Sequence, residues 1–109
     1  MKGKPSLPKL VVAITNAGDA WIMGSAARWF AGDDPPNDID IVVPFEKWQV
    51  VAPMIPRDAQ PNKFGGWRFT TDGVDVDVFP DNIGRLMSHT GCNDAWHPKS
   101  NNRWNRNMT

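Results

Sequence analysis

Two short runs of the chain carry aspartates at every second position. The run DIDIVVP contains Asp38 and Asp40, and the run VDVDVFP contains Asp75 and Asp77. Successive side chains of a β-strand point to opposite faces, so each pair of carboxylates shares one face of its strand. Neighbouring carboxylates repel each other unless a cation lies between them, and carboxylate oxygens suit Mg²⁺ or Mn²⁺. The spacing therefore predicts a divalent metal site built from these four aspartates.

A Gly-Ser pair earlier in the chain supplies a second chemical feature. The apolar run at residues 20–23 ends at Gly24, and Ser25 precedes the run AARWF. Serine is typical of a helix N-cap, and the N–H groups at the start of a helix bind phosphate oxygens. Glycine allows a phosphate to approach the backbone closely. The pair therefore predicts a phosphate-binding helix start near the metal site.

The hydrophobic pattern indicates the elements that must position these residues. Residues 10–15 fit either a strand or a helical stripe. The other predicted elements are strands at 20–23, 38–43, 67–71 and 74–79, and helices at 25–31, 44–55 and 81–87. The Asp72-Gly73 pair between the last two of these strands is a strong hairpin signal. On both acidic strands, aliphatic side chains occupy the face opposite to the aspartates.

These elements favour one α+β domain. If the two acidic strands are neighbours, their valines and isoleucines form a core under the helices, and their aspartates line an acidic cleft on the other face. We expect a small mixed sheet with helices packed on one face, folded from residues 1–90. Residues 91–109 have no hydrophobic period and are predicted to be an irregular basic tail, mobile or loosely docked. The basic and apolar start of the chain is expected to belong to the fold, because no cleavage site of a signal peptide follows it.

The segment MGSAARWFAGDDPPNDIDIVV resembles the signature of the polymerase-beta-like nucleotidyltransferase superfamily. That signature is an apolar residue, Gly, Gly or Ser, about a dozen further residues, and then Asp-apolar-Asp-apolar. The run VDVDVFP is similar to the strand that brings the family's third carboxylate. The likeness covers residues 20–86 and is greatest to short stand-alone members from bacteria and their phages. It implies the minimal nucleotidyltransferase fold, and transfer of a nucleoside monophosphate from an NTP to an acceptor hydroxyl with release of pyrophosphate.

The resemblance also implies roles for particular residues. Gly24 and Ser25 would hold the nucleotide phosphates, and Asp38 and Asp40 would bind two ions of Mg²⁺ or Mn²⁺. Arg28 lies one helical turn after Ser25. It is either a further phosphate ligand or a solvated helix residue.

The third carboxylate has two candidates, Asp75 and Asp77, because alternation places both on one face. Counted back from Pro80, Asp75 matches the spacing of the polymerases, whereas Asp77 directly precedes VFP as in the shorter members. We favour Asp77 as the catalytic metal ligand and expect Asp75 to support the site or to face the acceptor. Lys63 and Arg68 flank the expected cleft and are weaker candidates for phosphate contacts.

The composition bears on compartment and partners. The 109 residues include 12 basic and 12 acidic ones, so the net charge does not point to nucleic acid or to an acidic membrane. A single cysteine and the lack of an apolar run of about 20 residues favour a cytoplasmic protein without a membrane partner. The expected partners are an NTP and an acceptor, which is RNA, a small molecule or a protein. A second copy or a partner protein would supply walls that larger family members carry in additional segments.

Other interpretations remain open at this point. The Asp-x-Asp motif also occurs in glycosyltransferases, although the Gly-Ser helix start would then have no role. The main alternative without chemistry is a nucleotide- or partner-binding module on the same fold. His89, Cys92 and His97 are too irregularly spaced to favour zinc. Trp96 and Trp104 would either stack on a base or pack back onto the domain.

Overall fold

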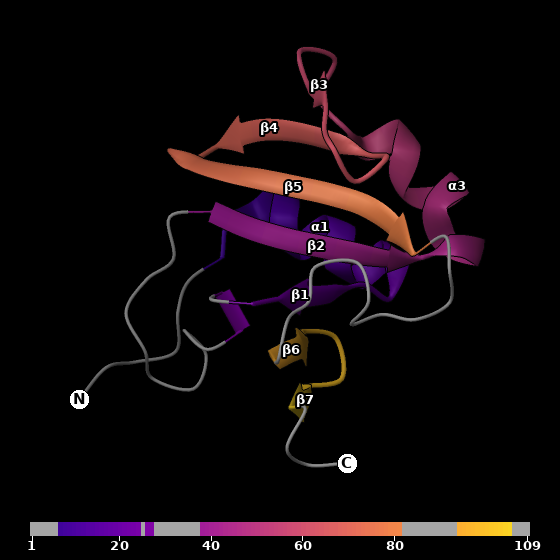
Figure 1. Cartoon of the computed structure of the whole chain (residues 1–109), viewed down its shortest axis with the longest axis vertical. Coiled ribbons are helices and arrows are strands. Elements are labelled where there is room, and N and C mark those ends of the chain that lie inside the picture. The colour runs from indigo at the N-terminus through magenta and orange to yellow at the C-terminus, as the bar shows by residue number, and fades with distance from the viewer. Residues whose placement is uncertain (1–6, 25, 28–37, 82–93, 106–109) are drawn as a thin grey trace.

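A mixed β-sheet organises the described part of the chain (Figure 1). The structure is a computed structural model, and it describes residues 7–24, 26–27, 38–81 and 94–105. Within these residues the sheet has seven strands, in the spatial order β3-β4-β5-β2-β1-β6-β7. The strands are β1 (Trp21–Met23), β2 (Asp38–Pro44), β3 (Gln60–Pro61), β4 (Trp67–Thr71), β5 (Val74–Asp81), β6 (Asp94–His97) and β7 (Asn102–Asn105). With the helices described below, this arrangement confirms the predicted α+β class.

The two acidic strands are neighbours at the centre of the sheet. β2 and β5 pair in parallel, so that Asp38 lies opposite Asp75 and Asp40 lies opposite Asp77. Every other pairing in the sheet of the described residues is antiparallel. The parallel register therefore brings both predicted aspartate pairs to one region of one face.

The predicted hairpin joins β4 to β5. Its two turn residues, Asp72 and Gly73, have positive φ angles of 52° and 77°. This is the backbone of a tight two-residue turn, whose twist matches that of the flanking strands. Because the turn contains only two residues, it determines which residues of β4 and β5 face each other.

Two helices lie wholly within the described residues: α1 (Lys9–Gly18) and α3 (Trp48–Val51). The ambiguous segment at residues 10–15 belongs to α1. The predicted helix over 44–55 is divided, because 3-10 turns η1 (Phe45–Lys47) and η2 (Ala52–Met54) flank α3. Pro53 lies within η2 and lacks the N–H group that a continuous helix would use. None of the helices formed by described residues has the length and apolarity needed to cross a membrane.

The main core lies between α1, α3 and the central strands (Figure 1). Val11 and Ile14 of α1 and Val51 of α3 are buried in it. The strands contribute the aliphatic residues that alternate with the aspartates, namely Ile39, Ile41, Val43, Val76 and Val78. The predicted division of β2 and β5 into an aliphatic and an acidic face is therefore confirmed. Burial of the aliphatic face also determines the register, because a slip by one residue would bury the carboxylates instead.

The C-terminal residues differ from the prediction. The sequence predicts an irregular tail at 91–109, and this prediction is wrong for residues 94–105, which form the β6–β7 hairpin on the free edge of β1. Ala95 is fully buried, and Trp104 packs against the cluster that contains Met23 and Phe79. Of the two alternatives for Trp104, the structure therefore shows the one in which it packs onto the domain. An open edge of β1 would leave backbone groups unpaired, and the hairpin satisfies them.

Candidate metal centre

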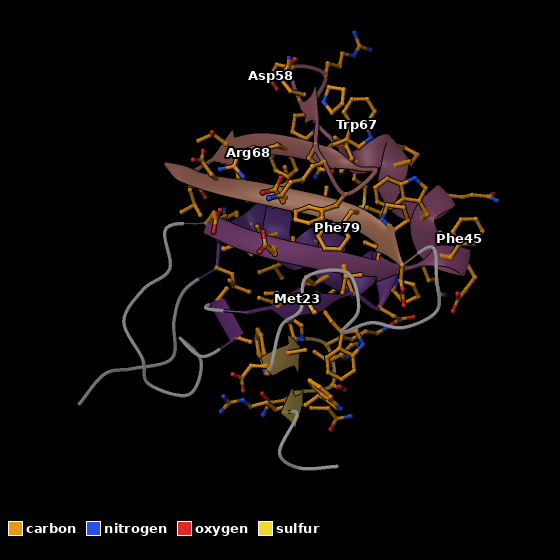
Figure 2. All side chains as sticks on the ribbon, viewed as in Figure 1. Met23, Phe45, Asp58, Trp67, Arg68 and Phe79 are labelled. Atoms are coloured by element: carbon orange, nitrogen blue, oxygen red, sulfur yellow. The ribbon has the colours of Figure 1, made fainter. Side chains whose placement is uncertain are left out.

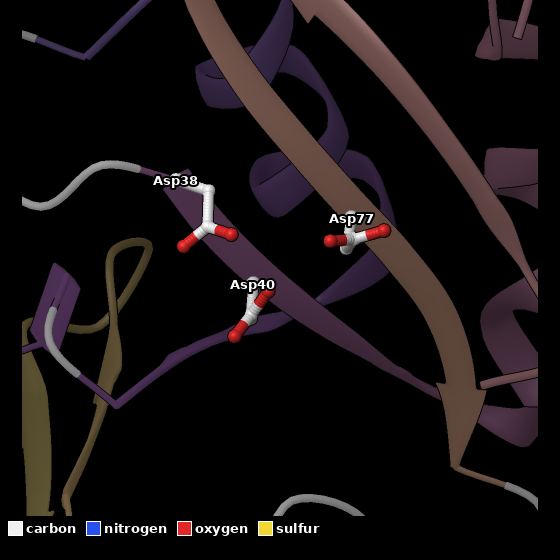
Figure 3. A group of neighbouring side chains, drawn as sticks. All are labelled: Asp38, Asp40 and Asp77. Carbon is white, nitrogen blue, oxygen red and sulfur yellow. The ribbon is translucent and has the colours of Figure 1, made fainter. Parts of the chain in front are cut away.

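Three aspartates converge on one face of the sheet (Figure 3). Asp38 and Asp40 come from β2 and Asp77 from β5, and one carboxylate oxygen of each lies within 4.8 Å of those of the other two. We call these three residues the acidic cluster. The side chain of Asp77 is only 7% exposed, whereas that of Asp38 is 40% exposed. The cluster is therefore buried at Asp77 and open to solvent at Asp38.

Burial and mutual repulsion make the cluster unfavourable when all three groups are charged. Burial, followed by the negative charges of Asp38 and Asp77, raises the pKa of Asp40 to about 6. The positive charges of Arg68 and Lys63 act in the opposite direction on this pKa, but they do not cancel the increase. A cation held between the carboxylates would favour the ionised form of Asp40.

The side chain of Arg68 supplies positive charge to this site (Figure 2). Its Nη1 donates to Oδ2 of Asp77 and lies 3.7 Å from Oδ2 of Asp38. Its Nη2 lies 3.5 Å from Oδ2 of Asp75. Arg68 occupies this position because the β4–β5 register places it directly opposite Asp77. The guanidinium thus lies between the acidic cluster and the fourth aspartate.

The fourth aspartate, Asp75, lies outside the acidic cluster. Its side chain is 49% exposed, and its Oδ1 accepts a hydrogen bond of 2.6 Å from Thr70 Oγ1. Thr70 faces it across the hairpin, as the register requires. Of the two candidates for the third carboxylate, the structure therefore brings Asp77 to Asp38 and Asp40.

Asn62 holds the buried carboxylate from the other side. Its Nδ2 donates to Oδ1 of Asp77 at 3.2 Å and to the carbonyl oxygen of Trp67 at 2.9 Å. Its Oδ1 accepts from the backbone N–H groups of Phe64 and Gly66 at 3.0 and 2.9 Å. Asn62 therefore ties the loop between β3 and β4 to Asp77 and orients this carboxylate.

The predicted phosphate-binding segment is described only in part. Gly24 has the positive φ of 67° that suits glycine. Its N–H donates to the carbonyl oxygen of Asp94 at 3.0 Å, so this group already has a partner in the sheet. Ala26 and Ala27 are helical and buried, whereas Ser25 and Arg28 lie outside the described residues. Any phosphate-binding N–H groups of this segment would therefore belong to residues after Gly24.

The acidic cluster is a group of ligands that could hold the predicted divalent ion. Mg²⁺ binds oxygen ligands at about 2.0–2.1 Å, so ligands on opposite sides of one ion lie about 4 Å apart. The oxygens of the cluster lie within 4.8 Å of one another, so they would have to draw closer together around a single ion. The ligands are all carboxylate oxygens, as Mg²⁺ and Mn²⁺ prefer.

The structure gives little support to the other candidates, the possible zinc ligands and the possible phosphate contact of Lys63. The ring of His97 lies against that of Trp21, with centroids 4.9 Å apart, and its Nδ1 lies 2.6 Å from Ser100 Oγ. His89 and Cys92 lie outside the described residues. Lys63 lies over the ring of Phe64, with Nζ 5.2 Å from its centroid. Among the described residues, the acidic cluster is the group of potential ligands that could hold a metal ion.

Comparison of the chain with family models, with curated proteins and with solved structures finds no match. The family resemblance therefore rests on the sequence motifs.

Proposed function

We propose that this protein is a metal-dependent nucleotidyltransferase, in which Asp38, Asp40 and Asp77 hold two ions of Mg²⁺ or Mn²⁺. The observation that carries the proposal is the convergence of these carboxylates from two parallel neighbouring strands. Two ions at such a site activate an attacking oxygen and stabilise the leaving phosphate oxygens. The minimal nucleotidyltransferase fold, with helices on one face and the acidic site on the other, is part of the same proposal.

The substrate would be an NTP, held beside the cluster by the segment after β1. Met23 pairs with Asp40 across the sheet, so β1 ends next to the cluster. Phosphates at the following helix start would interact with its N–H groups, with the Ser25 hydroxyl and with Arg28. In the proposed transfer, the acceptor hydroxyl oxygen bonds to the α-phosphorus while the α–β phosphoanhydride bond breaks. Pyrophosphate leaves, and the hydroxyl proton passes to solvent or to a carboxylate of the cluster.

The test has a binding stage and a chemical stage. Calorimetric titration of each NTP with Mn²⁺ and then with EDTA measures metal-dependent binding, and a pyrophosphate-release assay measures turnover. RNA, small hydroxyl compounds and protein extracts are added in turn as acceptors. Asp38→Asn should lose metal-dependent binding, whereas Asp58→Asn, at an exposed loop aspartate, should keep it. Equal NTP affinity with Mn²⁺ and with EDTA would count decisively against the proposed site.

One observation favours the alternative of a binding module without chemistry. Arg68 already places a positive charge against three aspartates, so the fold neutralises part of the cluster by itself. A module of this kind would bind a nucleotide or a partner and release no pyrophosphate with any acceptor. Binding of NTP without turnover, at full occupancy of Mn²⁺, would support this alternative.

A further inference from the structure

We infer that Arg68 competes with the metal ions, and that on metal loading its guanidinium moves from Asp77 to Asp75. Arg68 then lies at the rim of the site, where it can contact the triphosphate. The inference rests on the proposed metal site and adds a positioning role for two residues that the metal itself does not need, Arg68 and Asp75. It makes the arginine an intramolecular substitute for the cation.

The first support is the occupancy of the oxygens of Asp77. Asn62 donates to Oδ1, and Arg68 donates to Oδ2. A metal ion at the cluster needs an oxygen of Asp77 that faces Asp38 and Asp40. Arg68 Nη1 lies on that side, because it contacts Oδ2 of Asp77 and also lies 3.7 Å from Oδ2 of Asp38. The guanidinium and a metal ion would therefore compete for the same carboxylate oxygens.

The second support is the difference in how the two ends of the contact are held. Asp77 is buried and bonded to Asn62, so it stays in place. The side chain of Arg68 is 44% exposed, and arginine has a long, flexible stem. A metal ion and the guanidinium cannot both occupy the same oxygen of Asp77. Since Asp77 is held in place, Arg68 is the partner that moves away.

The third support is that the guanidinium already contacts Asp75, a partner outside the acidic cluster. Nη2 of Arg68 lies 3.5 Å from Oδ2 of Asp75, and Thr70 holds the other oxygen of Asp75 at 2.6 Å. Asp75 is half exposed and lies outside the acidic cluster. A metal ion bound by the cluster therefore does not displace the arginine from Asp75. A small rotation would strengthen this contact while Asp77 and Asp38 are released. Asp75 thereby lowers the cost of moving Arg68 away.

The decisive measurement is Mn²⁺ affinity, determined by calorimetry on the full chain after metal removal. A charge-assisted hydrogen bond to a buried carboxylate has to be broken before the metal binds, so Arg68→Gln should bind Mn²⁺ about 10–100-fold more tightly than the wild type. Arg57→Gln, which removes the same charge from an exposed loop position, should change the affinity less than about threefold. Equal or weaker Mn²⁺ binding by Arg68→Gln would overturn the inference while leaving the metal site intact. If neither the wild type nor Arg68→Gln binds Mn²⁺, both the inference and the proposed function are wrong.

A double-mutant cycle tests the role of Asp75. Asp75→Asn should weaken Mn²⁺ binding several-fold when Arg68 is present, and much less in the Arg68→Gln background, because no guanidinium then needs a second partner. Asp72→Asn removes one nearby charge at the hairpin turn, and asparagine tolerates the positive φ there. Its effect on Mn²⁺ affinity should be small and the same in both backgrounds. Identical losses from Asp75→Asn in the two backgrounds would show that Asp75 acts only through its charge, against the inference.

A measurement on the unmodified protein covers the case in which Arg68→Gln does not fold. The side-chain Nε–Hε signals of arginine are observed by NMR during a titration with Mg²⁺. The Arg68 signal should shift on saturation, and the Arg57 signal should not. An unchanged Arg68 signal at saturating Mg²⁺, with shifts in the backbone of β2, would exclude the movement.

Discussion

Replacing Asp40 by asparagine should stabilise the metal-free protein at neutral pH and remove its stabilisation by Mn²⁺. Burial and the neighbouring carboxylates raise the pKa of Asp40 from 3.8 to about 6 in the folded chain. The folded state therefore binds more protons than the unfolded state between about pH 4 and pH 6. Stability falls as the pH rises through this window and is constant above it, because the slope follows the difference in bound protons.

The magnitude follows from the size of the shift. A difference of about two pKa units corresponds to about 3 kcal/mol between the two protonation states. Asp40 is only partly buried, so solvent screening reduces this to about 1–2 kcal/mol of destabilisation by the charged form. Asparagine carries no charge at any pH and has nearly the same shape. Asp40→Asn should therefore raise the free energy of unfolding by about 1–2 kcal/mol near pH 7.5, and by much less near pH 4.

Urea unfolding followed by tryptophan fluorescence measures this effect, in EDTA and then in saturating Mn²⁺. Wild-type protein should gain stability from Mn²⁺ in proportion to the logarithm of its concentration, and Asp40→Asn should not. Asp58→Asn, at an exposed aspartate outside the cluster (Figure 2), is the matched control and should behave as the wild type does. The electrostatic reasoning is refuted if Asp40→Asn destabilises the metal-free protein equally at both pH values. An undiminished response of this variant to Mn²⁺ would refute its role as a ligand.

Five substitutions, compared in three tests, probe the site and the fold. Asp77→Asn should abolish metal-dependent NTP binding in calorimetry while Asp75→Asn only reduces it, and the opposite ranking at unchanged Tm would reverse their roles. Gly66→Ala should cost about 3 kcal/mol or more in urea unfolding, because its Cβ would lie 1.9 Å from a carbonyl oxygen of β5. Gly73→Ala, which meets no atom within 4 Å but keeps a φ of 77°, should cost only about 1 kcal/mol. Ser25→Ala should weaken triphosphate binding, and a change in Tm alone would make Ser25 a helix cap without a role in binding.

The central part of the fold was predictable because its signals are local. Alternation along DIDIVVP and VDVDVFP separates an aliphatic face from an acidic face without knowledge of any partner. The Asp72-Gly73 turn specifies a hairpin by its own backbone preference. That the two acidic strands lie side by side, in parallel, is a long-range contact, and the sequence supports it only through the benefit of merging the two aliphatic faces.

The C-terminal hairpin shows where this kind of reasoning fails. The run DAWHPKSNNRWN has little aliphatic content, and it carries no period that separates strand from coil. Its pairing depends on the bare edge of β1, a short strand far away in the chain. Buried Asp94, whose Oδ1 accepts from Arg103 at 3.1 Å, is equally hard to foresee, because a buried aspartate needs a partner that only the folded hairpin supplies.

The position of Arg68 beside Asp77 can be predicted from the sequence. In a two-residue hairpin, each step away from the turn adds one pair, so Thr71 faces Val74, Thr70 faces Asp75 and Arg68 faces Asp77. Counting outward from Asp72-Gly73 would have placed a cation beside the third carboxylate. The residue pattern without this count predicts only that Arg68 flanks the site. Asn62 had no such signal, because it reaches Asp77 from a loop.

The distinction between Asp75 and Asp77 could not come from alternation, since both lie on one face and each faces an aspartate of β2. Their surroundings separate them. Asp75 lies next to the turn, half exposed, with Thr70 as its neighbour. Asp77 lies two residues further into the sheet, where the loop anchored by Asn62 covers it. Asp77 is shielded from water and is bonded to Asn62 and Arg68, whereas the side chain of Asp75 is 49% exposed. The same strand therefore carries, two residues apart, a buried carboxylate bonded to Asn62 and Arg68 and an exposed one bonded to Thr70. Our proposal assigns the metal ion to the first and the displaced arginine to the second.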